Sequence, residues 1–109
     1  MRDHRLIDER SLALAQAIAD RLGLDPGLVA LARANLERWS KTCSPRARSS
    51  LQEWATVLDG PLEGVIALLT GQDERAVRLR QSNPFAGALP QNVRNEIFLR
   101  FEARDEAAT

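Results

Sequence analysis

Residues 80–89, Arg-Gln-Ser-Asn-Pro-Phe-Ala-Gly-Ala-Leu, decide how the last helix of this chain is attached to the rest of the fold. They interrupt a helical pattern and place a large apolar side chain, Phe85, between Pro84 and Gly87. A loop that only connects two elements usually runs over the surface and is polar. Phe85 therefore either packs inside the protein and fixes the last helix, or it is offered to another molecule. The two interpretations are compatible, because a loop fixed from inside is also a rigid surface.

The residues around Phe85 predict a fixed conformation for this 80–89 loop. Asn83 precedes proline, which favours an extended backbone and ends the preceding helix at about Ser82. Gly87 permits the positive φ needed to turn into the last helix. We expect Phe85 to be partly buried with an exposed edge, and the Arg80 guanidinium to reach carbonyls at the helix end or in the loop. The candidate partner-binding residues are Arg78, Arg80, Ser82, Pro84, Phe85 and Gly87.

Outward from this loop, the chain reads as helices punctuated by proline and glycine. Asp25-Pro26 and Ser44-Pro45 each supply an N-cap followed by proline at the first helical position. No window alternates with the period of two that a half-buried strand requires. The expected helices are 3–22, ended by Gly23, then 26–40, 45–59, 61–69, 73–82 and a last helix from residue 90. The sequence predicts an all-α fold, a compact bundle of five to six short helices.

Apolar residues recur at helical spacing and predict the buried face of each helix. Both tryptophans lie three positions after a leucine, which favours packing over ligand binding. The helix that Pro61 opens is so apolar that we expect it at the centre of the fold. The expected core positions are Ile7, Leu14, Ile18, Leu22, Leu28, Ala32, Leu36, Trp39, Leu51, Trp54, Ala55, Leu58, Leu62, Val65, Ile66, Leu69, Leu89, Val93, Ile97 and Phe101, with Phe98 beside the last stripe.

Length and charge restrict the class of protein. A chain of 109 residues suits one domain, residues 1–109, of which 103–109 are small or charged and are expected to fray. Fifteen basic and fifteen acidic residues are interleaved, whereas a nucleic-acid-binding domain usually carries a basic excess or stripe. No apolar stretch approaches the roughly 18–20 residues that cross a bilayer, and the opening residues are too charged for a secretion signal. We expect a soluble, cytoplasmic protein without a membrane segment.

The sequence offers little catalytic machinery. His4 is the single histidine and lies near the chain end, and Cys43 is the single cysteine. An intrachain disulfide is therefore excluded, and no pair of ligands supports a metal site. The carboxylates are scattered over helix surfaces, and neither a phosphate-binding loop nor a nucleophile motif appears. We predict that the protein is not an enzyme and uses neither a metal nor another cofactor.

A DNA-binding regulator is the alternative that an all-helical chain of this size raises. The best helix-turn-helix turn is Leu58–Pro61, but the following segment, 61–69, is too apolar to read base edges. Arginines at 46, 48, 75, 78 and 80 are able to contact phosphates, although pairing with nearby carboxylates explains them better. Binding to nucleic acid is therefore disfavoured. A self-associating structural subunit is a third alternative.

Four stretches together resemble one protein family: residues 6–12 (LIDERSL), 32–39 (ARANLERW), 51–54 (LQEW) and 79–89 (LRQSNPFAGAL). In this order they resemble small bacterial antitoxins, the MenA-like partners of MenT-like nucleotidyltransferase toxins. The resemblance covers most of residues 5–101, and 79–89 is its distinctive motif. Similar proteins often continue with Pro-Glu-Glu-Arg and an aromatic residue, whereas residues 90–94 here are Pro-Gln-Asn-Val-Arg.

The resemblance implies a protein-binding module that neutralises a toxin enzyme by direct, stoichiometric binding. We expect one helical face together with the 80–89 loop to cover the nucleotide or acceptor site of the toxin. Phe85, Arg78 and Arg80 are the expected main contacts, because aromatic and arginine side chains dominate protein interfaces.

Overall fold

The computed structural model describes the backbone of residues 4–108 and the side chains of residues 8–103. This part of the chain is all-α, as expected, and contains no strand. No helix within it is both long and apolar enough to cross a lipid bilayer. The helices are α1 (His4–Leu24), α2 (Leu28–Ser40), α3 (Pro45–Asp59), α4 (Leu62–Thr70), α5 (Glu74–Arg80) and α6 (Gln91–Ala108).

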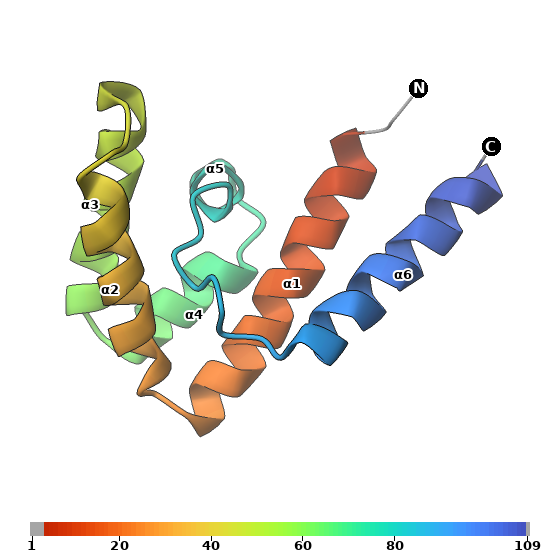
Figure 1. Ribbon diagram of the computed structural model, residues 1–109, viewed down its shortest axis with the longest axis horizontal. Coiled ribbons are helices and arrows are strands. Elements are labelled where there is room, and N and C mark those ends of the chain that lie inside the picture. The colour runs from red at the N-terminus through yellow and green to blue at the C-terminus, as the bar shows by residue number, and fades with distance from the viewer. Residues whose placement is uncertain (1–3, 109) are drawn as a thin grey trace.

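The helices form two antiparallel pairs with α4 and α5 between them (Figure 1). The pair α2–α3 is joined by a short turn, and the pair α1–α6 brings both ends of the chain to the same end of the molecule. Helix α4 packs against α1, α3 and α5, so it is central as the sequence predicted. Helix α6 packs mainly against α1. The 80–89 loop crosses from α5 to the beginning of α6.

The helix starts agree with the local signals in the sequence except at α2. Ser44 caps α3, since its Oγ accepts a hydrogen bond from the Ala47 N–H at 3.2 Å. The expected Asp25 N-cap of α2 is wrong: the Asp25 carboxylate accepts from the Gly27 N–H at 3.1 Å and closes a tight turn through Pro26 and Gly27, so that α2 begins only at Leu28. Prolines 61 and 90 directly precede α4 and α6. Starts are local events, which is why they are predictable.

The ends of α1 and α5 differ from expectation. Helix α1 passes through Gly23 to Leu24, because the Asp25 N–H still bonds to the Arg21 carbonyl and proline ends the helix only afterwards. Helix α5 ends at Arg80 rather than 82, since residues 81–83 bond to carbonyls three positions back as successive turns. Helix α6 extends to Ala108, and the expected fraying of residues 103–109 stays a prediction. Residue 109 lies outside the described part.

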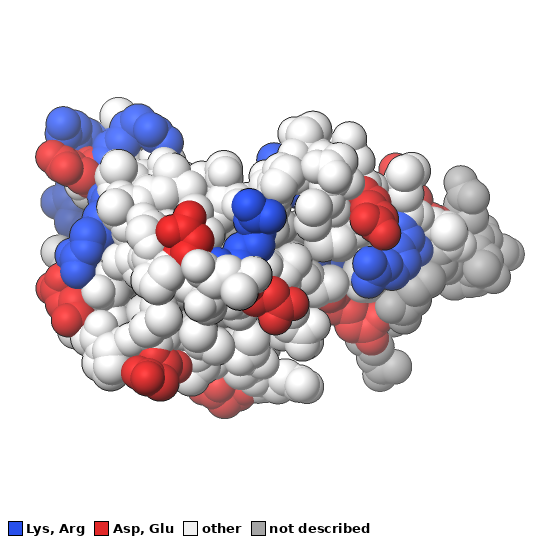
Figure 2. Space-filling model, turned by 90° about the horizontal axis from the view of Figure 1, so that it is seen from below, with Lys and Arg blue, Asp and Glu red and all other residues white. Residues whose placement is uncertain are grey.

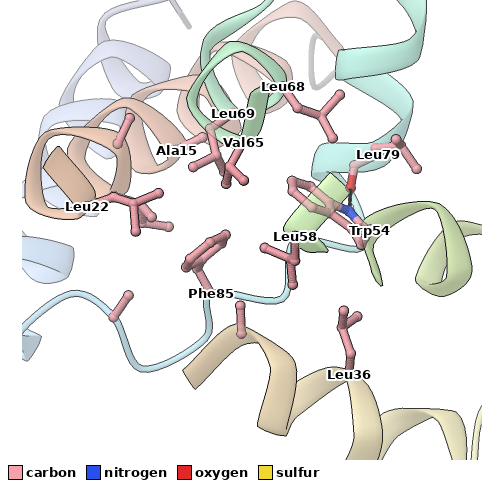
Figure 3. Packing of buried hydrophobic residues seen from close by; sticks show 14 of the residues in the cluster. Ala15, Leu22, Leu36, Trp54, Leu58, Val65, Leu68, Leu69, Leu79 and Phe85 are labelled. Atoms are coloured by element: carbon pink, nitrogen blue, oxygen red, sulfur yellow. Dashed lines mark hydrogen bonds between the residues drawn. The ribbon is translucent and has the colours of Figure 1, made fainter. Parts of the chain in front are cut away.

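The core lies where α1, α2, α3, α4 and the 80–89 loop meet. Figure 3 shows Phe85 pointing into the space between Leu22, Leu58 and Val65, with the Trp54 ring beside it. One expected core position is wrong. Ala55 is exposed, because it lies on the side of α3 that lines an open hollow toward α2. Several other expected positions are half-buried and pack against the core: Leu14, Leu28, Trp39, Leu62, Ile66 and Val93. The Ile7 side chain lies outside the described residues.

Candidate functional site

Phe85, the first candidate contact, is a core residue. Its side chain is 1% exposed, and its ring meets Trp54 edge to face, with the centroids 6.4 Å apart. Pro84 before it is buried as well. The expected exposed edge of Phe85 is therefore absent. The space that α1, α3 and α4 leave is deep enough to take the whole ring, so in this conformation Phe85 is not available to a partner.

The 80–89 loop is hydrogen-bonded to a buried asparagine of α2, a residue that the sequence analysis missed. Asn35 on α2 is 3% exposed, and its Nδ2 donates to the carbonyls of Pro84 at 2.8 Å and Ala86 at 3.0 Å. Its Oδ1 accepts from the Arg38 guanidinium at 2.6 Å. A buried asparagine with every polar atom bonded rigidifies what it touches. The sequence signal was available: position 35 lies within the buried stripe of α2, where a polar residue needs a partner.

Arg80 is also buried and serves the fold. Its side chain is 6% exposed, and Nη1 donates to the carbonyls of Leu68, Leu69 and Gly71 at the end of α4. The expectation that it reaches backbone carbonyls is confirmed, but the carbonyls belong to α4 rather than to α5 or the loop. Burial lowers the pKa of Arg80, and the carboxylates of Asp73 and Asp8 oppose this change. The guanidinium stays charged at neutral pH and satisfies carbonyls that the helix end leaves open.

The remaining candidate residues lie nearer the surface. Arg78 is exposed and forms a salt bridge to Glu53 of α3 at 3.0 Å, which ties α5 to α3. Ser82 is half-buried. Gly87 is exposed and has φ of 91°, as the turn requires. A Cβ added there would meet only Leu31 Cδ2 at 4.0 Å, so the backbone angle and not the space demands glycine. The structure thus separates the six candidates into a buried set (Arg80, Pro84, Phe85) and a more accessible set (Arg78, Ser82, Gly87).

The loop lines a small concavity together with α1 and α6. The concavity has a volume of about 160 Å³, and its accessible edge includes Ala86, Gly87 and Arg94. Arg94 and Arg10 flank the ring of Phe98, with their guanidinium carbons 5.8 and 5.1 Å from its centroid. This hollow is too small for more than one side chain of another molecule.

A larger hollow, the α2–α3 groove, runs between helices α2 and α3. It has a volume of about 470 Å³. Leu36 and Leu51, which also belong to the core, form an apolar floor with the exposed Ala55. The remaining lining residues are polar: Arg33, Glu37 and Ser40 from α2, and Arg48 and Gln52 from α3. The sequence analysis missed this surface, because Ala55 continues the apolar stripe of α3 and was therefore expected in the core.

The charges on the groove rim are only partly neutralised within the chain. Arg33 forms a salt bridge to Asp59 at 2.7 Å and also donates to the Leu58 carbonyl at 2.9 Å. Glu37 and Arg48 are exposed, and neither side chain has an ion-pair partner among the described residues. The groove therefore presents an unpaired anion on α2 and an unpaired cation on α3, on either side of an apolar floor.

Charge elsewhere on the surface is mixed. The face in Figure 2 carries Lys and Arg beside Asp and Glu both at its edges and toward its middle, and shows no continuous basic stripe. Among the residues that the structure describes, no three His, Cys, Asp or Glu side chains are grouped to hold a metal ion. Cys43 is half-buried, and its thiol faces the Ser40 carbonyl at 3.7 Å.

Comparison with protein-family models, curated proteins and solved structures gives no match to this chain.

Proposed function

We propose that this protein is a protein-binding module, and that it acts as an antitoxin that neutralises a toxin enzyme by stoichiometric binding. The observation that carries the binding role is the α2–α3 groove, with its apolar floor and its two unpaired rim charges. A surface of this composition resembles the centre and rim of a protein interface. The groove is open along one side, whereas a small-molecule site buries most of its ligand.

In this proposal the α2–α3 groove, and not Phe85 and Arg80, makes the main contact with the toxin. These two side chains are 1% and 6% exposed, so they contribute by holding the surface rigid instead of contacting the toxin. A rigid surface binds more tightly, because less conformational entropy is lost on association. The accessible edge of the loop, Ala86 and Gly87, is a secondary contact.

The resemblance in residues 79–89 supports the choice of a toxin as partner, and of a nucleotidyltransferase as the toxin. In this proposal the protein covers the nucleotide or acceptor site of the enzyme, and an interface of about 1,600 Å² is needed for a stable complex. The mechanism is occlusion, which requires no catalytic residue in this chain.

The test uses the purified product of the adjacent gene and measures both binding and enzymatic inhibition. The wild-type protein should form a complex of defined stoichiometry and abolish nucleotide transfer by the toxin. Ala55→Arg fills the groove and should weaken binding at least about tenfold, which is about 1.4 kcal/mol. Thr56→Arg is the matched control, since Thr56 is exposed on the same helix but does not line the groove.

The outcomes are distinct. Absence of a complex between wild-type protein and the adjacent gene product would reject the antitoxin proposal. A complex that Ala55→Arg and Thr56→Arg leave equally strong would keep an antitoxin but move its binding face away from the groove.

A further inference from the structure

We infer that the α2–α3 groove binds one amphipathic α-helix of a partner protein, with an acidic side chain beside Arg48 and a basic side chain beside Glu37. This inference rests on the proposed protein-binding function and specifies the chemistry of the segment bound. Three observations carry it: the spacing of the lining residues, the small side chains at the groove ends, and the rim charges.

The lining residues follow helical spacing on both sides. Each helix contributes positions i, i+3, i+4 and i+7: residues 33, 36, 37 and 40 of α2, and residues 48, 51, 52 and 55 of α3. Such a set forms a straight ridge along about two helical turns, roughly 10 Å at 1.5 Å per residue. Two ridges on adjacent helices enclose a groove of the kind into which a third helix packs. A bound helix would place its own i, i+4 and i+7 apolar side chains against the floor.

Small side chains leave room for a helix backbone. Ser40 lies toward the turn end of the groove and Ala55 toward the other end, and both are exposed. The Ser40 hydroxyl is already occupied by the Glu37 carbonyl at 2.9 Å. Ala55 is apolar and exposed, and it lies beside the core residues Leu36 and Leu51. The apolar surface of the core therefore reaches the solvent at this position. A partner side chain on this floor would extend the core of the hairpin.

The rim charges define the flanks of the bound helix. Glu37 and Arg48 stand on opposite helices, and Arg33 is already neutralised by Asp59. A helix with acidic side chains on both flanks would place a like charge beside Glu37. A helix with basic side chains on both flanks would place a like charge beside Arg48. The best ligand therefore carries one flank of each sign. Rim charges of this kind select and orient a partner more than they bind it.

The experiment uses three synthetic 18-residue helical peptides with the same leucine stripe. One has an acidic and a basic flank, one has two acidic flanks, and one has two basic flanks. Binding is measured by fluorescence anisotropy, and the contact surface is located by amide chemical-shift changes in the labelled protein. The mixed peptide should bind best, by about three- to tenfold over the other two, which is the scale of exposed charge pairs. The shifts should gather at residues 33–40 and 48–55.

Rim variants should change the preference in a defined direction. Glu37→Lys makes both rims basic, so the doubly acidic peptide should become the best ligand. Arg48→Glu makes both rims acidic, so the doubly basic peptide should become the best ligand. Two exposed residues outside the groove serve as controls, Glu63→Lys and Arg46→Glu, and neither should alter the order. Ala55→Arg should weaken all three peptides at least about tenfold, while Thr56→Arg should not.

The helix inference is overturned if no peptide binds at millimolar concentration, if the rim variants leave the order unchanged, or if the shifts gather at residues 83–94. These results do not decide the toxin partner. Binding of the mixed peptide without binding of the adjacent gene product would reject the antitoxin and keep the helix site. If the adjacent gene product binds but no helical peptide binds in the groove, the antitoxin proposal is kept and the helix site is rejected.

Discussion

At the scale of single residues, Phe85 connects the 80–89 loop to the core. Because its side chain is 1% exposed and packs against Trp54, Phe85→Ala should lower the free energy of unfolding by about 3–5 kcal/mol. Denaturant unfolding monitored by tryptophan fluorescence measures this loss. Leu99→Ala is the control, since Leu99 is 64% exposed and its removal should change little. Equal stability of the two variants would mean that Phe85 is not a core residue in solution.

Asn35 fixes the same loop through hydrogen bonds instead of packing. Asn35→Ala leaves the buried Pro84 carbonyl and the partly buried Ala86 carbonyl without their donor, which should cost about 1–3 kcal/mol. Asn92→Ala, at an exposed position of α6, should stay within about 0.5 kcal/mol of wild type. Thermal melting compares the two. A loss for Asn35→Ala no greater than that of the control would show that water replaces its hydrogen bonds.

At the scale of elements, Arg80 joins α5 to the end of α4. Arg80→Met keeps an apolar stem but removes the donors to the Leu68, Leu69 and Gly71 carbonyls, and should destabilise the protein by about 1.5–3 kcal/mol. Arg75→Met, exposed on the same helix, should have little effect. Chemical denaturation of both variants tests the difference. An Arg80→Met protein as stable as Arg75→Met would contradict the assignment of Arg80 as the cap of α4.

Helix α6 has one main helix neighbour, unlike the central helix α4. It packs chiefly against α1, whereas α4 contacts three helices. Elements with fewer buried contacts open at lower free energy. Backbone amides of α6 should therefore exchange with deuterium faster than those of α4 at equal temperature and pH. Mass spectrometry of peptic fragments gives both rates, and equal protection would indicate that α6 is held by more than α1.

At the scale of the whole molecule, the balance of charge decides which large partners are favoured. The fifteen basic and fifteen acidic residues give no net charge, and the face in Figure 2 shows both signs mixed. Because non-specific DNA binding arises from phosphate neutralisation, random duplex DNA at physiological salt should bind more weakly than about 10⁻⁴ M. Fluorescence anisotropy with a labelled duplex measures this. Tighter, strongly salt-dependent binding would favour the regulator alternative.

The overall dimensions reflect how the two helix pairs are joined. The radius of gyration is 14.4 Å, above the roughly 13 Å typical of a compact chain of 100 residues. Helix α6 lies at one side of the molecule and the α2–α3 hairpin at the other, with α4 and α5 between them. The α2–α3 groove and α6 therefore lie on opposite sides of the molecule, and substitutions can alter one without the other.

The helical class, most of the helix starts and most of the buried stripes followed from the amino-acid sequence. These features are local: Ser44 caps α3 from three residues away, and Pro61 and Pro90 act on the helices that follow them. The apolar spacing also identified α4 as central. Local steric and hydrogen-bonding rules are sufficient for such features, so they can be read before any contact between helices is known.

The positions of Phe85 and Arg80, the role of Asn35 and the α2–α3 groove became clear only from the packing of the helices. Each depends on which segments meet: Asn35 bonds to a carbonyl 51 residues away, and Arg80 to carbonyls up to 12 residues away. A loop phenylalanine beside proline and glycine has the same local sequence whether its ring faces the core or the solvent. The depth of the space left by α1, α3 and α4 places it inside, and that depth is set by packing between distant helices.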